Sequence, residues 1–305
     1  MLVDAVKRFN SVTFPQTVGE ISAEAEHSRQ ARKQVLPFKH RTRYSDITHD
    51  TAYQVAAACC AARCRDDKIV PVGRKIGFTN KNIWPDYNID ASIWSYVYSD
   101  TVSIVRTGQT VDISRSRGLE PRIEPEIVFG IKKTPSTGMS EEELLECIQW
   151  VAHGFEVVHS IYPSWRFTAT DTIIGFGLHG QLLIGGRHEL SSTVADGSLT
   201  AWITQLRDLH VDLLCNGKIV DSGRGINVLG SPLRALQHLV ELLDKQTLHP
   251  RLQPGEVVTT GTLTQALPIS HGDRWQTKIS GVGLSDLDIT FDLTAPASRT
   301  IASRL

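Results

Sequence analysis

Three glutamates in two apolar segments are the residues of this sequence best suited to hold a metal ion. Glu124 and Glu126 alternate with apolar residues in Ile123-Glu124-Pro125-Glu126-Ile127, and Glu156 lies in the apolar run Phe155-Glu156-Val157-Val158. Side chains alternate between the two faces of an extended segment, so Glu124 and Glu126 share one face, about 7 Å apart. Such carboxylates repel one another unless a divalent cation neutralises them, and all-oxygen ligands favour a hard ion such as Mg²⁺, Mn²⁺ or Ca²⁺. The alternative is a solvated strand face, with Glu156 unrelated to the pair.

The composition excludes several classes of partner. The chain of 305 residues has 32 basic and 33 acidic residues, with 41% hydrophobic residues. This near-neutral balance gives no electrostatic reason to expect nucleic acid or an anionic membrane as a partner. No apolar run is long enough to span a bilayer, and the first residues lack the apolar core of a signal peptide. We therefore expect a cytoplasmic protein whose five cysteines are reduced.

The segments that must position the glutamates are predicted from apolar periodicity and capping signals. The spacing of small and apolar residues from 50 to 65 predicts a helix, and residues 73–80 predict a short strand that enters a loop. Ser140 followed by Glu143 matches a capping box. We therefore expect a helix that begins there, ends near residues 153–154 and leads into the second apolar run.

The remaining segments predict a chain rich in short strands. Residues 1–47 are polar with weak periodicity, and we expect an arm or a poorly ordered lead-in. Ser231-Pro232 begins a predicted helix, and alternating segments near the C-terminus predict a β-hairpin. Many short strands without regular strand–helix alternation predict an α+β fold, a mixed β-rich roll with helices packed on one side. We expect an N-terminal arm and helical cap over residues 1–70 and a catalytic β-rich domain over residues 71–305.

Several motifs resemble, in type and in order along the chain, the hydratase and decarboxylase branch of the fumarylacetoacetate hydrolase superfamily. This branch includes 2-oxopent-4-enoate hydratases and 4-oxalocrotonate decarboxylases. The motifs are Gly73-Arg74-Lys75-Ile76-Gly77-Phe78-Thr79, Pro121-Arg122-Ile123-Glu124-Pro125-Glu126, Phe155-Glu156-Val157-Val158, Ser222-Gly223-Arg224-Gly225 and Thr260-Gly261. The resemblance implies the β-rich roll of the superfamily's C-terminal domain.

The resemblance also implies a metal centre. Glu124, Glu126 and Glu156 match the family's ligands for one Mg²⁺ or Mn²⁺, which a small 2-oxo acid substrate chelates through its carboxylate and 2-oxygen. Lys75 matches the active-site lysine, and we expect the metal and the substrate to lower its pKa so that it can move protons. The structural alternative for Lys75 is a strand-end cation. The expected assembly is a homo-oligomer.

Further candidates follow from the resemblance, each with a structural alternative. Asp171 matches a catalytic position near the active site, although an Asp before Thr172 can equally cap a turn. His179 is a candidate donor to the substrate, and its alternative is a buried structural histidine. Ser222 and Arg224 lie in a glycine-rich turn that we expect to approach the substrate, where Arg224 can meet a carboxylate. The predicted substrate-binding set also includes Ile93, Trp94 and Thr260.

The resemblance favours a metal-dependent lyase that hydrates a 2-hydroxy-2,4-dienoate, or its 2-oxo-4-enoate form, to a 4-hydroxy-2-oxo acid. Decarboxylation of an oxalocrotonate-like 2-oxo-enedioate is the alternative. Ile93 replaces the Asp that hydratases of this branch carry, and Ile93-Trp94 is similar to some decarboxylase-like relatives. A third possibility is a non-catalytic binding protein that keeps the fold. C–C bond hydrolysis is disfavoured, since no motif matches the catalytic histidine of the superfamily's hydrolases.

Overall fold

Two mixed β-sheets form the frame of the protein in the computed structural model, which describes residues 9–87, 89, 91–190 and 198–294. In the larger, eight-stranded sheet the order is β2 (Ile93–Tyr98), β1 (Pro71–Gly77), β10 (Val257–Thr259), β5 (Arg122–Ile131), β6 (Ile148–Val158), β7 (His179–Glu189) and β3 (Val102–Ile104), while β11 (Leu267–Pro268) pairs with β5. The five strands of the smaller sheet are β4 (Gln109–Asp112), β13 (Asp288–Asp292), β12 (Arg274–Ser280), β8 (His210–Cys215) and β9 (Lys218–Arg224). Parallel and antiparallel pairs occur in both sheets, so the predicted mixed β-rich roll is confirmed.

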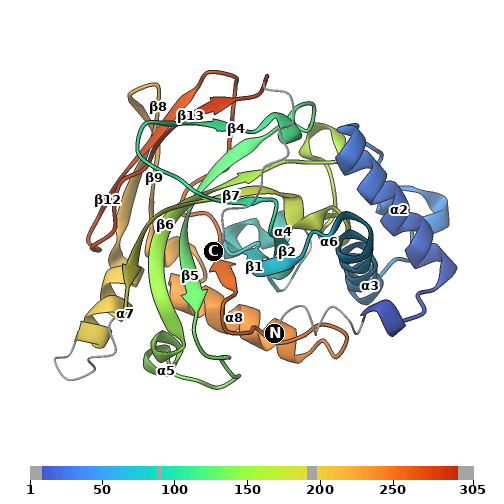
Figure 1. Cartoon of the computed structure of the whole chain (residues 1–305), viewed down its shortest axis with the longest axis horizontal. Coiled ribbons are helices and arrows are strands. Elements are labelled where there is room, and N and C mark those ends of the chain that lie inside the picture. The colour runs from blue at the N-terminus through green and yellow to red at the C-terminus, as the bar shows by residue number, and fades with distance from the viewer. Residues whose placement is uncertain (1–8, 88, 90, 191–197, 295–305) are drawn as a thin grey trace.

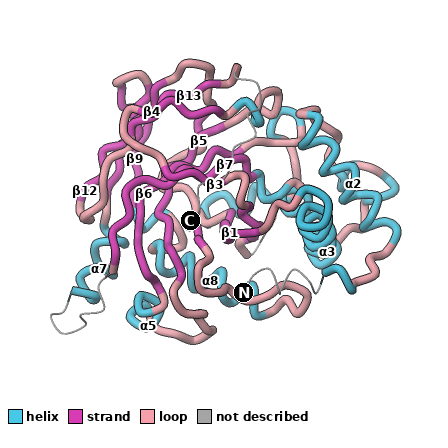
Figure 2. The backbone as a smooth tube through the Cα atoms, viewed as in Figure 1, coloured by secondary structure: helices cyan, strands magenta, loops and turns pink. Residues whose placement is uncertain are grey.

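The helices form two groups that pack around the sheets (Figures 1 and 2). One group, on the right of Figure 1, contains α2 (Gln16–Ala31), α3 (His49–Ala62) and α6 (Ala169–Ile174). The other, along its lower edge, contains α5 (Glu141–Glu146), α7 (Ser198–Asp208) and α8 (Pro232–Asp244). A single turn, α4 (Trp84–Tyr87), follows β1. Every helix in the described part of the chain is too short or too polar to cross a lipid bilayer.

The N-terminal segment is better ordered than its sequence suggests. We expected a loose lead-in over residues 1–47, but residues 16–31 form α2, which buries Val18, Ile21 and Ala25. These side chains belong to the same hydrophobic cluster as Ile127 of the larger sheet. The hydropathy of α2 is too weakly periodic to show this, because small residues make up much of its buried face. Residues 1–8 lie outside the described residues, and the division at residue 70 stays a prediction.

The strand that carries Glu156 begins earlier than predicted. The capping box is present, with the Ser140 hydroxyl accepting from the Glu143 N–H and the Glu143 carboxylate accepting from the Ser140 N–H. However, α5 ends at Glu146, and β6 starts at Ile148. The prediction of a helix reaching residues 153–154 was therefore wrong. The apolar residues after 147 fit both the helical and the strand period. They form a strand because β6 pairs with β5 on one side and with β7 on the other.

Other predicted elements are confirmed. The helix expected over residues 50–65 is α3, followed by a π-helical turn from Arg63 to Asp67. The Ser231 hydroxyl accepts from the Arg234 N–H at 3.1 Å and so caps α8. Near the C-terminus, β12 and β13 pair antiparallel, as the alternation predicted.

Gly73 is required where β1 meets β10, because a Cβ there would lie 2.1 Å from the Val257 carbonyl oxygen. We expect Gly73→Ala to lower the free energy of unfolding by about 3 kcal/mol or more, the upper range for overpacking. Chemical denaturation measures this loss. The control is Gly19→Ala in α2, where nothing lies within 4 Å of the added Cβ, and where we expect a gain of about 0.5–1 kcal/mol. Equal stability of the Gly73 variant and the wild type would contradict the packing of β1 against β10.

Candidate metal centre and active site

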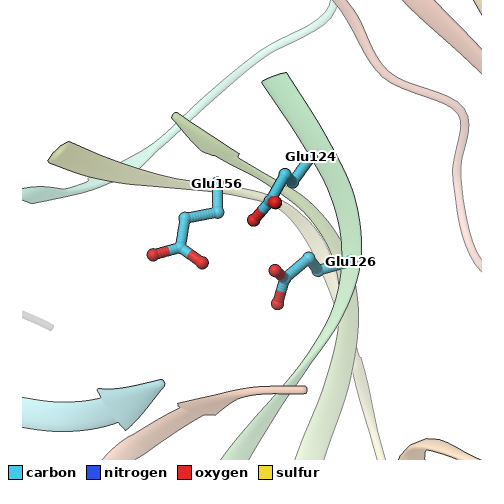
Figure 3. A group of neighbouring side chains, drawn as sticks. All are labelled: Glu124, Glu126 and Glu156. Atoms are coloured by element: carbon cyan, nitrogen blue, oxygen red, sulfur yellow. The ribbon is translucent and has the colours of Figure 1, made fainter. Parts of the chain in front are cut away.

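The pairing of β5 with β6 brings the three glutamates together. Glu124 stands directly opposite Glu156 in the antiparallel register, and Glu126 follows two residues later on the same face of β5. One ligand oxygen from each of the three residues lies within 4.8 Å of the others. The three carboxylates gather on one side of the strands (Figure 3). The structure thus brings the three predicted metal ligands together. The alternative, a solvated strand face with Glu156 unrelated to the pair, does not predict this proximity.

The contacts of Glu126 fit a site for a hard cation. This fully buried side chain accepts hydrogen bonds at Oε2 from the Thr259 hydroxyl and from the Gly261 N–H, the latter at 2.7 Å. Its Oε1 has no hydrogen-bond partner among the described residues. A buried carboxylate oxygen without a donor is costly, and a divalent cation with oxygen ligands supplies what is missing. The donor set therefore fits Mg²⁺ or Mn²⁺.

The electrostatics of the cluster show the same need for positive charge. Burial raises the pKa of Glu124 to about 7, although Lys75 opposes this shift. Burial together with the charges of Glu156 and Glu124 raises the pKa of Glu126 well above its usual value. Burial opposes ionisation of Glu156 too, but Lys75 and His179 outweigh it and hold the pKa of Glu156 below its usual value. Without a cation, the cluster cannot carry three full negative charges at neutral pH.

Lys75 lies beside the glutamates, as the sequence predicted. It stands on β1 with only 5% of its surface exposed, and its Nζ lies 2.9 Å from Glu156 Oε2. Burial alone lowers the pKa of Lys75, but the charges of Glu156, Glu124 and Glu126 outweigh burial and raise it. The raised pKa belongs to the protein without a bound ion, where three carboxylates surround the ammonium group; the lowered pKa expected beside a metal and substrate stays a prediction.

A cavity of about 380 Å³ opens above this cluster. Lys75, Glu124 and Glu126 line its polar part, while Ile93 lies in its wall as predicted. The other apolar lining residues include Phe78, Ile83, Phe167 and Leu178. Arg122 also lines the cavity, and its guanidinium lies 4.0 Å from the centre of the Trp165 ring. The cavity therefore combines a carboxylate cluster, an apolar wall and two cationic side chains.

His179 lies behind Glu156 and does not line this cavity. Its Nδ1 lies 2.8 Å from Glu156 Oε1, and its Nε2 lies 2.8 Å from the Thr101 hydroxyl. The predicted contact with substrate is corrected accordingly: His179 orients a metal-ligand candidate. Such outer partners fix the direction of a ligand's lone pairs.

We expect His179→Leu to weaken metal binding by about 10- to 100-fold, the usual cost of losing an outer partner of a ligand. His179→Asn keeps a donor toward Glu156 and should retain most of the affinity. Equilibrium titration with Mn²⁺ measures both. His188→Leu, an exposed histidine on the same strand, is the control and should bind Mn²⁺ like the wild type. Unchanged affinity in His179→Leu would contradict the positioning role.

Asp171 and Trp94 are placed away from the cavity. Both oxygens of the Asp171 carboxylate are occupied, by the Lys39 N–H on one side and by the N–H and hydroxyl of Thr168 on the other. Asp171 is therefore a helix cap of α6, and the prediction of a catalytic role is corrected. Trp94 points to the opposite face of β2 from Ile93, where its ring stacks on Tyr53 at 5.2 Å. It contributes to the core and does not contact the substrate cavity.

The glycine-rich turn and Thr260 also serve packing. The Thr260 hydroxyl donates to the Ile127 carbonyl at 2.9 Å. Ser222 and Arg224 are exposed on β9, and the Ser222 hydroxyl donates to Asp212 at 2.6 Å. A Cβ on Gly223 would lie 2.0 Å from the backbone oxygen of the loop at residue 263. The turn thus approaches the segment at residue 263. Ser222, Arg224 and Thr260 do not line the cavity, and their contact with substrate stays a prediction.

Some functional candidates were missed from the sequence. Thr259 and Gly261 donate hydrogen bonds to Glu126, and they flank Thr260, which the sequence predicted as a substrate-binding residue. Arg122 and Trp165 line the cavity as a stacked pair. Arg122 carried a detectable signal, since it lies two residues before Glu124 and so shares its strand face. Trp165 comes from a distant loop, and its position depends on tertiary structure alone.

Comparison with known proteins agrees with this geometry. Residues 74–289 match the family described as fumarylacetoacetate (FAA) hydrolase C-terminal. A 2-hydroxyhexa-2,4-dienoate hydratase of Comamonas testosteroni is 27% identical over 248 residues, which cover 81% of this chain and 88% of that protein. A 4-oxalocrotonate decarboxylase of Pseudomonas sp. (strain CF600) is 28% identical over 270 residues, covering 87% and 95%. The relatives thus include a hydratase and a decarboxylase, the two kinds of lyase that the sequence predicted.

A solved structure has the same fold. It is 4-oxalocrotonate decarboxylase from Pseudomonas putida G7, complexed with magnesium and adipate. The TM-score is 0.78 at 22% sequence identity, and the match covers 92% of this chain and 99% of that one. The predicted roll and the predicted family are confirmed. The chain belongs to the fumarylacetoacetate hydrolase C-terminal family.

Proposed function

We propose that this protein is a metal-dependent lyase that hydrates a 2-hydroxy-2,4-dienoate, or its 2-oxo-4-enoate form, to a 4-hydroxy-2-oxo acid. The observation that carries the proposal is the group of three carboxylates within 4.8 Å, two of which line a cavity together with Lys75. Glu124, Glu126 and Glu156 hold Mg²⁺ or Mn²⁺ in this proposal. The hydratase relative, which acts on a dienoate, supports the substrate class. Assembly as a homo-oligomer and a cytoplasmic location stay predictions.

The chemistry follows from the side chains in the cavity. A bound divalent ion neutralises the carboxylates, lowers the pKa of Lys75 and stabilises the negative charge that develops on the 2-oxygen of the substrate. Ketonisation moves the 2-hydroxyl proton to C-5, after which water adds its hydroxyl to C-4 and a proton to C-3. In this proposal Lys75, which lines the cavity, gives and takes these protons. Ile93, Phe78 and Phe167 form an apolar wall that shields the tail from bulk water.

Decarboxylation of a 2-oxo-enedioate is the second candidate, and three observations favour it. The wall residue Ile93 cannot orient water or accept its proton. Arg122 offers a guanidinium inside the cavity, suited to a second carboxylate. The solved relative was crystallised with adipate, a dicarboxylate. In this reaction the bond between carbon and carboxylate breaks, CO₂ leaves, and a proton from Lys75 takes its place.

Product analysis tests the proposal. The protein is incubated with Mg²⁺ and either a 2-hydroxydienoate or the corresponding carboxylated precursor. We expect loss of the dienoate ultraviolet absorbance and formation of a 4-hydroxy-2-oxo acid. Release of CO₂ without hydrated product would show that the protein is a decarboxylase and not a hydratase. Absence of both products for every substrate, including those with bulky apolar tails, would leave only the non-catalytic binding protein.

A further inference from the structure

A second cavity, of about 300 Å³, lies behind the metal centre. His179 lines it while holding Glu156, so this residue lies between the two spaces. No residue that lines the first cavity also lines the second. Four arginines face the second cavity, and we call it the arginine cavity. They are Arg29, Arg32, Arg63 and Arg115.

The charges around the arginine cavity leave an excess of positive charge. Two aspartates line it, and Asp100 pairs with Arg115 at 2.6 Å. Glu26 pairs with both Arg29 and Arg63, at 2.8 and 2.5 Å. Arg32 forms no ion pair with any residue that the structure describes. Four guanidinium groups thus face three carboxylates in all.

Two buried side chains of the cavity lining carry nitrogen atoms without partners. Arg63 is only 4% exposed, and its Nη2 has no hydrogen-bond partner among the described residues. His159 is 5% exposed, and its Nε2 is likewise unpaired there, while its Nδ1 lies 2.8 Å from the Ser116 hydroxyl. The Arg63 nitrogen is a buried donor, and buried donors normally have partners, so its lack of one points to a ligand with acceptor oxygens.

The most buried arginine of the cavity, Arg63, is held in place before any ligand arrives. Arg63 begins the π-helical turn that ends α3, a local distortion often found at functional sites. Its guanidinium lies 4.2 Å from the centre of the Tyr98 ring and 4.5 Å from that of Phe176. Phe176 has a φ of 62°, an uncommon backbone conformation for a phenylalanine. Fixed cationic planes of this kind bind oxyanions with little loss of side-chain entropy.

We propose that the arginine cavity binds a small oxyanion of the sulfate, phosphate or carboxylate class, at a site separate from the substrate cavity. The planar guanidinium groups match the paired oxygens of such an anion. The excess positive charge and the unpaired Nη2 of Arg63 supply the attraction. The volume of about 300 Å³ is sufficient for a small anion.

Calorimetric titration of the metal-loaded protein with sulfate tests this site, at an ionic strength held constant with chloride. We expect saturable binding by the wild type. Arg32→Gln should weaken it by about tenfold or more, the cost of losing a hydrogen bond to a charged group. The control is Arg187→Gln, an exposed arginine stacked 4.5 Å from the Trp150 ring, which should bind sulfate like the wild type. Acetate, titrated separately, distinguishes carboxylate from tetrahedral anions.

A second variant guards against loss of folding. Because Arg63 pairs with Glu26, the two are replaced together by glutamine, which removes the buried ion pair. Arg29, the second partner of Glu26, then loses its carboxylate, but its side chain is more exposed than that of Arg63. This double variant should fold, as circular dichroism reports, and should lose sulfate binding. Absence of saturable binding of sulfate and acetate by the wild type would overturn the proposal. So would equal affinity in wild type and Arg32→Gln, or binding that disappears in Glu126→Gln, since the anion would then lie at the metal centre.

Discussion

Replacement of Glu126 by glutamine is expected to abolish metal binding and turnover together while leaving the fold intact. The side chain keeps its shape, but it loses the charge and the free Oε1 that the cation needs. We expect the affinity for Mn²⁺ to fall by more than about 100-fold, beyond the loss caused by removing an outer partner of a ligand. Equilibrium Mn²⁺ titration and the dienoate absorbance assay measure the two effects.

A matched variant separates this effect from a general loss of charge. Glu189 is an exposed glutamate at the end of β7, and Glu189→Gln should bind Mn²⁺ and turn over substrate like the wild type. Activity of the Glu126 variant in the presence of chelator would contradict the metal centre. Loss of folding by circular dichroism would move the test to Glu124→Gln, whose side chain is less buried.

Replacement of Lys75 by methionine is expected to reduce turnover far more than metal affinity. The cavity then loses its proton-transfer group, and general acid–base catalysis contributes about 100- to 10,000-fold. Metal affinity should change little or rise, because the ion pair with Glu156 that competes with the cation is removed. Turnover number and Mn²⁺ affinity are measured on the same preparation.

The control for this variant is Lys81→Met. Lys81 is exposed and its Nζ lies 5.5 Å from the centre of the Trp84 ring, so the substitution removes the same charge near the cavity mouth. We expect wild-type turnover from it. If Lys75→Met loses metal affinity and turnover equally, Lys75 serves only to hold the glutamates in place.

The sequence was most informative where local pattern and chemistry coincide. Alternation placed Glu124 and Glu126 on one face, and the register of β5 with β6 then puts Glu156 opposite Glu124. The same alternation separates Ile93 from Trp94, since neighbours on a strand face opposite sides. Ile93 and Trp94 therefore cannot both face the same cavity, and only Ile93 lines it.

Other predictions failed because they depend on tertiary contacts. Asp171 has the residue type of a catalytic acid, but its surroundings make it a cap. Residues from 148 onward fit a helix by period, and only the neighbouring strands decide for β6. The arginine cavity draws on α2, the π-helical turn after α3 and the loop after α6, so no single stretch of sequence contains its signal.

Anomalous diffraction from crystals of the protein grown with Mn²⁺ and an unreactive 2-oxo acid tests the central claim most directly. The account predicts one Mn²⁺ peak per chain, within coordination distance of a carboxylate oxygen from each of Glu124, Glu126 and Glu156. The 2-oxo acid should contact the same ion, with Lys75 Nζ facing it. A peak elsewhere, or an ion that leaves any of the three glutamates uncoordinated, would contradict the account.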